Sequence, residues 1–251
     1  MRYEKQMKVI VTRPSPDAEA FAAAAARLGA DPLISPVMAI RNREASLDLS
    51  GISALAFTSS NGVRAFAALS SERSFKVFAV GEATAAAATL AGFSEVDIAT
   101  GDVESLSALI LKSKPTRSVL HLAGSERAGD LVRHLSLKGV SARRAVIYEA
   151  VKIDHMTPEA ARALSEIGNS SAVVLFSPRS ARLFLDQARR DGVLDQLRSA
   201  TAFCLSGEVA EEASESRWQT TLVAEERNAA AMLRLVERLI AGRKGRTGAP
   251  R

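Results

Sequence analysis

Two strand–loop–helix patterns each occur twice along this chain, and this repetition restricts its fold more than any other feature. The first pattern opens with an apolar run at Val9 and closes with a helical stretch that ends at Gly29. Its second copy opens at Val119 and closes at Gly139, so both landmarks repeat at an offset of 110 residues. Because the offset stays constant, the two copies align through the whole unit.

The second pattern contains a strand, a glycine turn and a closing helix, and its copies lie 126 residues apart. Gly81 corresponds to Gly207 in the glycine turn, and Leu109 corresponds to Leu235 in the closing helix. A duplicated α/β sequence predicts two similar lobes, and two lobes predict a ligand cleft between them.

Short β-prone runs alternate with longer alanine- and leucine-rich stretches, an order typical of parallel α/β architecture. The runs at 119–122 and 173–176 are apolar without polar alternation, which predicts strands buried on both faces. The stretches 17–28 and 130–137 predict helices that pack on a sheet. We therefore predict an α/β fold of two flavodoxin-like lobes, each with a parallel sheet flanked by helices.

Two further β-prone runs, 38–44 and 144–152, occupy equivalent places in the repeat. We expect them to cross between the lobes and to pair as a two-stranded antiparallel linker. One lobe then consists of residues 1–37 and 153–241, and the other consists of residues 45–143. A single division close to the middle of the chain is the alternative.

Composition agrees with two globular lobes. Of the 251 residues, 47% are apolar and 24% are charged, which is enough apolar material to bury two cores. The net charge of +5 arises mostly in residues 242–251, which hold four basic residues and no acidic one. The other 29 basic residues nearly balance 28 acidic residues. We therefore expect a disordered basic tail at 242–251 and no binding of nucleic acid.

The cysteine content and the apolar runs bear on the compartment. The single cysteine, Cys204, cannot form an internal disulfide and fits a reducing environment. Residues 1–8 contain no apolar signal core, and no run approaches the roughly 18 apolar residues of a membrane span. Since no coiled-coil pattern indicates self-association, we expect a cytoplasmic monomer that has no membrane partner.

Several motifs of common enzyme classes are missing from the sequence. It contains no G-x-G-x-x-G, no Gly-Lys-Ser/Thr and no G-x-S-x-G, which removes the usual support for nucleotide and serine-hydrolase sites. The three histidines have no metal-ligand spacing, and no cysteine cluster accompanies them. We therefore expect neither a metal nor an organic cofactor.

Polar loops follow directly after the predicted strands. This edge of a parallel α/β sheet is where ligands bind, and N–H groups at helix starts attract carboxylates or phosphates. Ordinary helix caps use the same residue types, so both interpretations stay open for any single loop. The number of such loops favours an anion-binding site. Its candidate residues are Arg13, Thr58, Ser59, Ser60, Asn61, Gly81, Thr84, Gly124, Ser125, Ser177, Arg179, Ser180 and Gly207.

Tyr148 is the candidate catalytic residue. It is one of two tyrosines and lies in the second predicted crossing strand. A phenol can donate a proton to a leaving group. A structural tyrosine that bridges two strands is the alternative.

Taken together, these motifs resemble the uroporphyrinogen-III synthase family over nearly the whole chain. The order and spacing of the segments carry the resemblance more than any one of them. The segments are V-I-V-T-R-P at 9–14, F-T-S-S-N-G-V at 57–63, A-V-G-E-A-T-A at 79–85, the strand with Tyr148, F-S-P-R-S at 176–180 and the turn at Gly207.

The resemblance implies a bilobed fold with a two-stranded linker and a cofactor-independent enzyme of haem biosynthesis. The implied substrate is hydroxymethylbilane, a linear tetrapyrrole polycarboxylate, and the implied reaction is its dehydrating cyclisation with inversion of the last pyrrole ring through a spiro intermediate. The enzyme that makes hydroxymethylbilane is a candidate partner.

The resemblance also implies roles for single residues. Tyr148 matches a tyrosine that assists loss of the hydroxyl group. Thr84, Ser59 and Ser177 match hydroxyl residues of the paired loops. The turn at Gly207 departs from the pattern, because Glu208 follows and the threonine equivalent to Thr84 is missing. Backbone contacts from that turn are the expectation instead.

Two other classes of protein remain open. A non-catalytic two-lobe binding or sensor protein for a small anionic ligand would have the same architecture, because a fold does not fix a function. A flavodoxin-like redox module is favoured less, since these loops lack the aromatic residues that flavin sites use.

Overall fold

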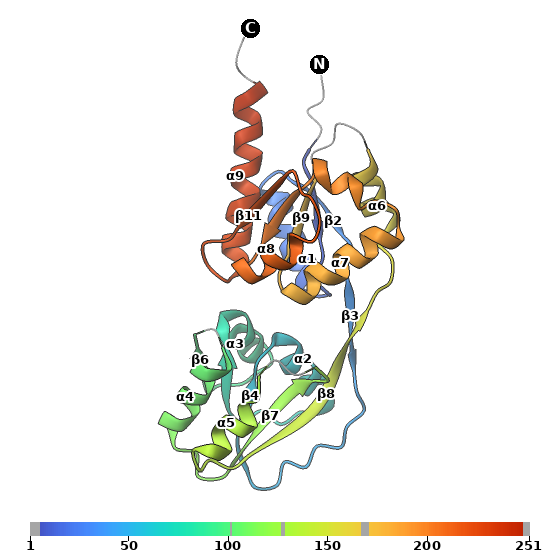
Figure 1. Ribbon diagram of the computed structural model, residues 1–251. Helices are drawn as coiled ribbons and strands as arrows, with labels where there is room; N and C mark the ends of the chain where they lie inside the picture. The colour runs from blue at the N-terminus through green and yellow to red at the C-terminus, as the bar shows by residue number, and fades with distance from the viewer. Residues whose placement is uncertain (1–5, 101, 127–128, 167–170, 248–251) are drawn as a thin grey trace. The chain divides into compact units, whose positions relative to one another are not determined.

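The protein consists of two compact α/β units, seen in a computed structural model that describes residues 6–100, 102–126, 129–166 and 171–247 (Figure 1). The discontinuous unit comprises Met1–Ala39 and Val151–Arg251, and the continuous unit comprises Ile40–Ala150. The chain therefore passes from one unit to the other twice, and no single cut divides it into two.

The discontinuous unit is built on a five-stranded sheet in the order β11-β10-β9-β1-β2, and all of its pairings are parallel. Helices α1 and α9 cover one face, while α6, α7, α8 and a short 3₁₀ helix cover the other. The strands are β1 (Lys8–Val11), β2 (Asp31–Ile34), β9 (Ala172–Leu175), β10 (Thr201–Cys204) and β11 (Thr220–Val223). The helices are α1 (Asp17–Arg27), α6 (Pro158–Ser165), α7 (Pro178–Arg190), η1 (Asp195–Ser199), α8 (Gly207–Ala213) and α9 (Ala229–Thr247).

The continuous unit is built on a six-stranded sheet in the order β3-β8-β7-β4-β5-β6. Helices α2 and α3 pack on one face, and α4 and α5 pack on the other. Its strands are β3 (Met38–Asn42), β4 (Ile52–Phe57), β5 (Lys76–Val80), β6 (Val96–Ala99), β7 (Ser118–Gly124) and β8 (Ala142–Lys152). Its helices are α2 (Ser60–Leu69), α3 (Gly81–Leu90), α4 (Val103–Ser113) and α5 (Leu131–Leu137).

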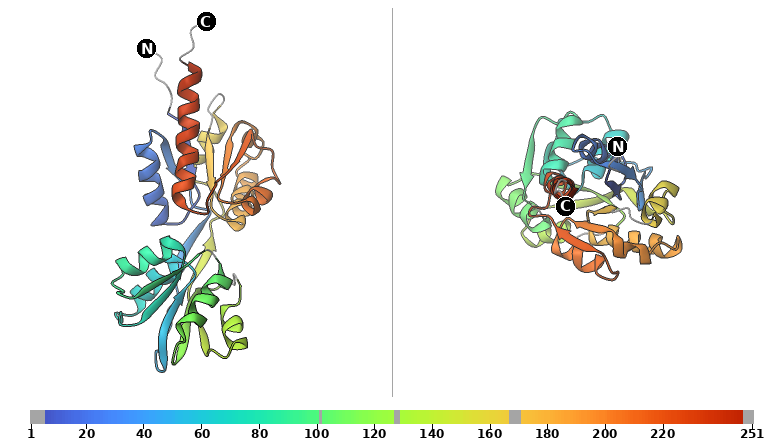
Figure 2. Two further views of the ribbon diagram at one scale, coloured as in Figure 1. Left: turned by 90° about the vertical axis from the view of Figure 1, so that its left-hand side faces the viewer. Right: turned by 90° about the horizontal axis from the view of Figure 1, so that it is seen from above.

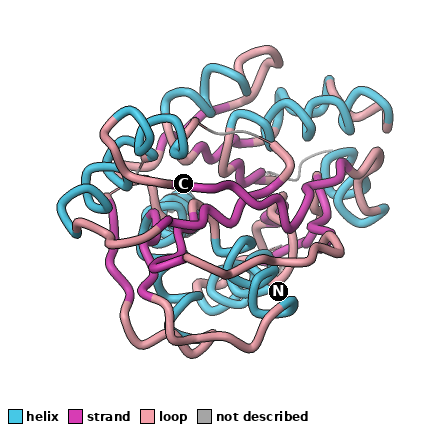
Figure 3. The backbone as a smooth tube through the Cα atoms, turned by 90° about the horizontal axis from the view of Figure 1, so that it is seen from below, coloured by secondary structure: helices cyan, strands magenta, loops and turns pink. Residues whose placement is uncertain are grey.

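The sequence repeat reappears in the order of the strands. In each sheet, three strands of the second pattern are followed by the strands of the first: β11-β10-β9-β1-β2 matches β6-β5-β4-β7-β8. Helices flank the strands in both units (Figure 3), and the central strands β9 and β10 are buried along their whole length. The predicted α/β fold of parallel sheets flanked by helices is confirmed.

The two predicted crossing runs form β3 and β8, which are neighbours in the second sheet. The backbone N–H of Arg43 donates to the Ile147 carbonyl at 2.9 Å, and that of Ile153 donates to the Val37 carbonyl at 3.0 Å. β8 begins at Ala142 because its first half pairs in parallel with β7. The antiparallel pairing expected for the linker stays a prediction.

The prediction of a disordered tail from residue 242 is wrong as far as Thr247, because α9 continues to that residue. Figure 2 shows α9 extending beyond the sheet of its own unit. Alanine, arginine and lysine are strong helix formers, and each residue added to an existing helix adds a hydrogen bond. A glycine costs about 1 kcal/mol in a helix, which does not end one that is already formed. Residues 248–251 lie outside the described residues.

The described helices give no sign of a membrane span: none combines the length and the apolar character that a crossing requires. Cys204 is fully buried, as a small apolar residue would be. Burial raises the pKa of its thiol to about 12, so it is not a candidate nucleophile.

Replacing Asp102 by alanine should lower the unfolding free energy by about 1 kcal/mol, because Asp102 caps α4. Its carboxylate accepts the backbone N–H of Ser105 at 2.7 Å, and the Ser105 hydroxyl completes a capping box. Urea unfolding followed by circular dichroism measures the change. Asp186→Ala is the matched control, since it removes only a surface ion pair with Arg189 and should have less than half that effect. Equal losses in the two variants would contradict the capping role.

Candidate functional site

The sheet of the continuous unit gathers most of the predicted site residues at one edge. β7, β4 and β5 are parallel neighbours, so the loops after them emerge side by side. These loops and the strand end hold Thr58, Ser59, Ser60, Asn61, Gly81, Thr84, Gly124 and Ser125. The discontinuous unit does the same with β1, β9 and β10, whose following loops hold Arg13, Ser177, Arg179, Ser180 and Gly207.

The ring of Tyr148 lies against two glycines. A Cβ atom at Gly124 would lie 2.9 Å from the Cε2 and Cζ atoms of the ring and 3.2 Å from its hydroxyl oxygen. A Cβ atom at Gly62 would lie 3.7 Å from ring atom Cε1 and 2.9 Å from the carbonyl oxygen of Leu122. Only a residue without a side chain leaves room for the phenol at Gly124.

A β-bulge turns Tyr148 toward these glycines. Ala123 pairs with Val146, but the next residue, Gly124, pairs with Tyr148, so Ile147 is an extra residue in β8. Both Ile147 and Tyr148 therefore pack on the core beneath α2 and α3. With regular alternation, Tyr148 would face the opposite side of the sheet, and a bulge of this kind is a common means of redirecting a side chain near a functional site.

The Tyr148 hydroxyl is available to a ligand. Within the described residues no side chain or backbone group hydrogen bonds to it, and Tyr148 is half-buried. Its backbone carbonyl accepts the N–H of Ser125 at 2.9 Å, which ties the residue to the loop after β7. The catalytic role of Tyr148 stays a prediction, and this geometry leaves the phenol free to perform it.

Several predicted hydroxyl side chains act as helix caps. Ser59 caps α2 by accepting the N–H of Asn61 at 3.2 Å. Ser177 caps α7 in the equivalent place and forms a capping box with Ser180, whose N–H donates to the Ser177 hydroxyl at 3.0 Å. For these three serines, the capping interpretation describes the side chains, so a ligand at these loops would meet mainly the helix starts.

The first turns of α2 and α3 differ in what they expose. Arg64 donates to the Ser60 hydroxyl at 3.2 Å and to the Asn61 side-chain oxygen at 2.6 Å, which brings a cation to that loop. In α3, Gly81 has φ of +74°, a left-handed conformation that favours glycine. Thr84 is buried, at 5% exposed. Sequence reasoning missed Arg64, whose one signal is its helical spacing from the polar loop.

Arg13 joins the loops after β1 and β9 of the discontinuous unit. Its guanidinium forms an ion pair with Asp17 at 2.8 Å and lies 4.4 Å from the centre of the Phe176 ring. Arg179 belongs to the first turn of α7. Both predicted arginines therefore lie at the strand-end edge of this sheet, where a carboxylate could meet them.

Glu208, which raised doubt about the turn at Gly207, is exposed and forms an ion pair with Arg227 at 2.7 Å. Hydrogen bonds from the Ser206 hydroxyl and from the backbone, together with Arg227, lower the Glu208 pKa to about 2. The charge of Glu208 is thus offset locally. Gly207 itself is exposed at the start of α8, with no atom near the position of a Cβ.

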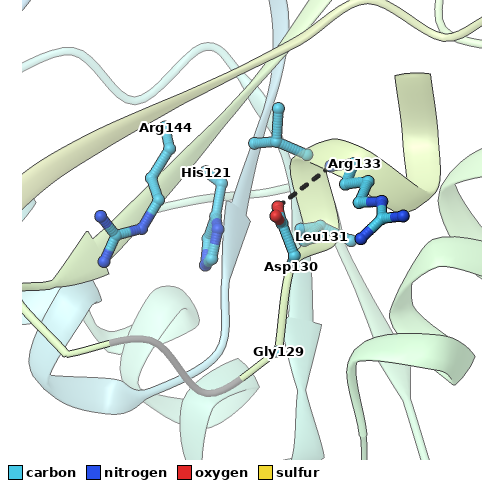
Figure 4. A pocket seen from close by; sticks show the side chains of 7 residues that line it. His121, Gly129, Asp130, Leu131, Arg133 and Arg144 are labelled. Atoms are coloured by element: carbon cyan, nitrogen blue, oxygen red, sulfur yellow. Dashed lines mark hydrogen bonds between the residues drawn. The ribbon is translucent and has the colours of Figure 1, made fainter. Parts of the chain in front are cut away.

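A cavity of about 270 Å³ lies beside the same strand-end loops of the continuous unit (Figure 4). It is lined by His121, Gly129, Asp130, Leu131, Val132, Arg133 and Arg144. The Nε2 atom of His121 lies 3.4 Å from the Thr58 hydroxyl. Burial, aided by the charge of Arg144 and opposed by Asp130, lowers the His121 pKa to about 4, so the ring is neutral at neutral pH.

Two residues of this cavity, His121 and Arg144, were missed from the sequence. They are partners across β7 and β8, and their proximity depends on strand pairing that no local pattern shows. The described residues also contain no group of three or more histidine, cysteine, aspartate or glutamate side chains that could hold a metal ion.

Known proteins similar to this chain share one description. A sequence profile of the family described as "Uroporphyrinogen-III synthase HemD" matches residues 19–234. The uroporphyrinogen-III synthetase of Helicobacter pylori 26695 has a similar structure, with a TM-score of 0.60 and 20% identity over 93% of this chain and 100% of that chain. A mutant uroporphyrinogen III synthase of the extremely thermophilic bacterium Thermus thermophilus gives a TM-score of 0.52 and 19% identity over 94% and 99%. At these identities the two structures support the fold alone, and no curated sequence matches the chain.

Proposed function

The chain belongs to the uroporphyrinogen-III synthase family, and we propose that Tyr148 and the strand-end loops carry out its reaction. Enzymes of this family are hydro-lyases of haem biosynthesis, and this chain is one of them. The reaction removes water from hydroxymethylbilane, closes the macrocycle and inverts the last pyrrole ring to give uroporphyrinogen III.

The geometry of Tyr148 is the observation that carries the proposal. Its ring is held by a bulge and by the close approach of Gly124, while its hydroxyl has no partner among the described residues. In the proposed step, the phenol gives its proton to the hydroxymethyl oxygen as the C–O bond breaks, and water leaves. The phenolate takes back a proton when the pyrrole ring that was attacked in cyclisation becomes aromatic again.

The substrate's carboxylates bind at the strand-end loops of both units. Helix starts carry partial positive charge, and the loops offer little side-chain bulk to keep a carboxylate away. Arg13, Arg64 and Arg179 add positive charge at these edges. Binding in several places folds the flexible bilane, and this positioning selects inversion over direct closure.

We also propose that the enzyme works as a cytoplasmic monomer without metal or organic cofactor. The lack of cofactor motifs in the sequence supports this, as does the balance of charge outside the basic C-terminal residues. The enzyme that makes hydroxymethylbilane remains the candidate partner, because it would hand over a reactive product.

The decisive experiment incubates the protein with freshly generated hydroxymethylbilane and separates the oxidised products by isomer. Predominantly type III uroporphyrin would establish cyclisation and ring inversion together. Only type I isomer, formed at the rate of spontaneous closure, would overturn the proposal and favour a binding or sensor protein. Such a protein would bind a tetrapyrrole polycarboxylate without turning it over.

Gly124→Ala should lower kcat for type III product about tenfold, because the new methyl group must displace the Tyr148 ring. The Cβ would lie 2.9 Å from two ring atoms, closer than non-bonded carbons approach. Gly242→Ala in α9 is the matched control, since its Cβ meets no atom within 4 Å and should leave kcat unchanged. Wild-type kcat in Gly124→Ala would show that the ring position is not critical.

A further inference from the structure

Arg144 lies on β8 four residues before Tyr148, and its side chain lines the cavity beside His121 (Figure 4). It packs on the α4 and α5 side of the sheet, where Leu131 belongs to the same core. Tyr148 packs on the other side, beneath α2 and α3. The two residues therefore reach the end of β7 from opposite faces of one sheet.

The guanidinium of Arg144 serves backbone carbonyls. Its Nη2 atom donates to the carbonyl oxygen of Gly124 and, at 3.3 Å, to that of Glu126. Among the described residues no carboxylate forms an ion pair with it. A half-buried cation without a carboxylate partner is costly to keep, unless the carbonyls that it binds need to be held.

Those carbonyls need a donor because of the bulge. The extra residue Ile147 interrupts the ladder between β7 and β8 at Gly124, and a bulge leaves backbone groups without their usual partners. On the other side of the same loop, the N–H of Ser125 donates to the Tyr148 carbonyl at 2.9 Å. The segment 124–126 is thus fixed by Arg144 through its carbonyls and by Tyr148 through its N–H.

We propose that Arg144 is a positioning residue that fixes Gly124 against the ring of Tyr148 and so aims the phenol at the substrate. The inference rests on the proposed function of Tyr148 and adds a residue that acts only through it. Hydrogen bonds from a charged donor are stronger than neutral ones, and the planar fork of arginine suits two neighbouring carbonyls. Without this anchor the bulge loses its donor, and the ring loses the surface that it packs on.

The first test is a double-mutant cycle between Arg144→Gln and Tyr148→Phe. Arg144→Gln alone should lower kcat about tenfold, as expected for loss of a charged hydrogen bond, with KM changed less than about twofold. In the Tyr148→Phe background it should have almost no further effect, because a residue that acts through the phenol has nothing left to position. The same fall in both backgrounds would overturn the inference.

Arg143→Gln is the matched control on the neighbouring position of β8. Arg143 also donates to two backbone carbonyls, those of Asp48 and Ser50, and forms an ion pair with Asp48 at 3.3 Å. It contacts neither Gly124 nor Tyr148 in any described interaction, so kcat should stay within about twofold of wild type. Arg144→Lys keeps the charge but loses the fork, and it should recover part of the rate. A tenfold fall in Arg143→Gln would mean that any loss of charge on β8 suffices and would overturn the inference.

The position of the ring can be followed without catalysis. Tyr148 is one of two tyrosines, so in a Tyr3→Phe background it gives the single tyrosine ring signal in NMR of tyrosine-labelled protein. Arg144→Gln should shift and broaden that signal, while Arg143→Gln should not. This readout separates two failures: an unchanged rate in Tyr148→Phe would remove the proposed catalytic role, whereas an unchanged ring signal in Arg144→Gln would remove the positioning role.

Discussion

Replacing Tyr148 by phenylalanine should slow formation of uroporphyrinogen III about 100-fold and still leave measurable activity. A positioned general acid contributes about two to four orders of magnitude, and the lower part of that range applies because the hydroxymethyl group already leaves readily from an electron-rich pyrrole. Phenylalanine keeps the ring that packs on Gly124 and Gly62. Only proton donation is lost, while the loops still fold the substrate.

The measurement for Tyr148→Phe is kcat for type III product, with type I product recorded in the same runs. Tyr3→Phe is the matched control, because it removes the other phenol of the chain and should leave kcat unchanged. Complete loss of activity in a folded Tyr148→Phe protein would show that the phenol is indispensable. A wild-type rate would remove Tyr148 from the mechanism.

The architecture was predictable because it depends on patterns repeated along the chain. Apolar runs predicted the buried strands, and the constant offsets predicted two lobes with one strand order. The end of α9 was not predictable in the same way. Glycine and proline near the C-terminus are typical of disorder, yet a helix that is already packed through Met232, Leu235 and Val236 continues past single glycines.

The edge of the sheet was predictable, but the way in which Tyr148 reaches its ring position was not. The run around Tyr148 reads as a regular strand, and nothing in it marks Ile147 as an extra residue. The bulge exists because β8 pairs with β7 through Val146 and then again through Tyr148. Gly124 was chosen as a loop residue that allows close backbone approach, whereas the structure shows that it makes room for a side chain.

Side chains that act across strands were also missed. Arg144 and His121 are 23 positions apart and meet only because their strands pair. Conversely, Ser59, Ser177 and Ser180 were predicted as ligand contacts, and the structure uses their hydroxyl groups as caps. Residue type alone cannot separate the two uses, since both need a hydroxyl group at the start of a helix.

Acid should destabilise the protein through His121, by about 3 kcal/mol once the pH has fallen from 6.5 to 4. The pKa of His121 is lowered from 6.5 to about 4, first by burial and then by the charge of Arg144. Between these values the unfolded chain binds a proton at His121 and the folded protein does not. Stability is therefore complete above pH 6.5 and is lost as the pH falls toward 4.

The test compares wild type with His121→Gln by urea unfolding at pH 7 and at pH 4.5. Carboxylates titrate in both proteins, so the difference between their pH slopes isolates His121, and the variant should lose less stability on acidification. His134→Asn is the matched control, because it removes a less buried histidine from α5 and keeps His121. Equal slopes in wild type and His121→Gln would contradict the prediction. The expected slope ties stability to the site, since a proton on His121 places a second positive charge opposite Arg144 and weakens the anchor of the loop at Gly124.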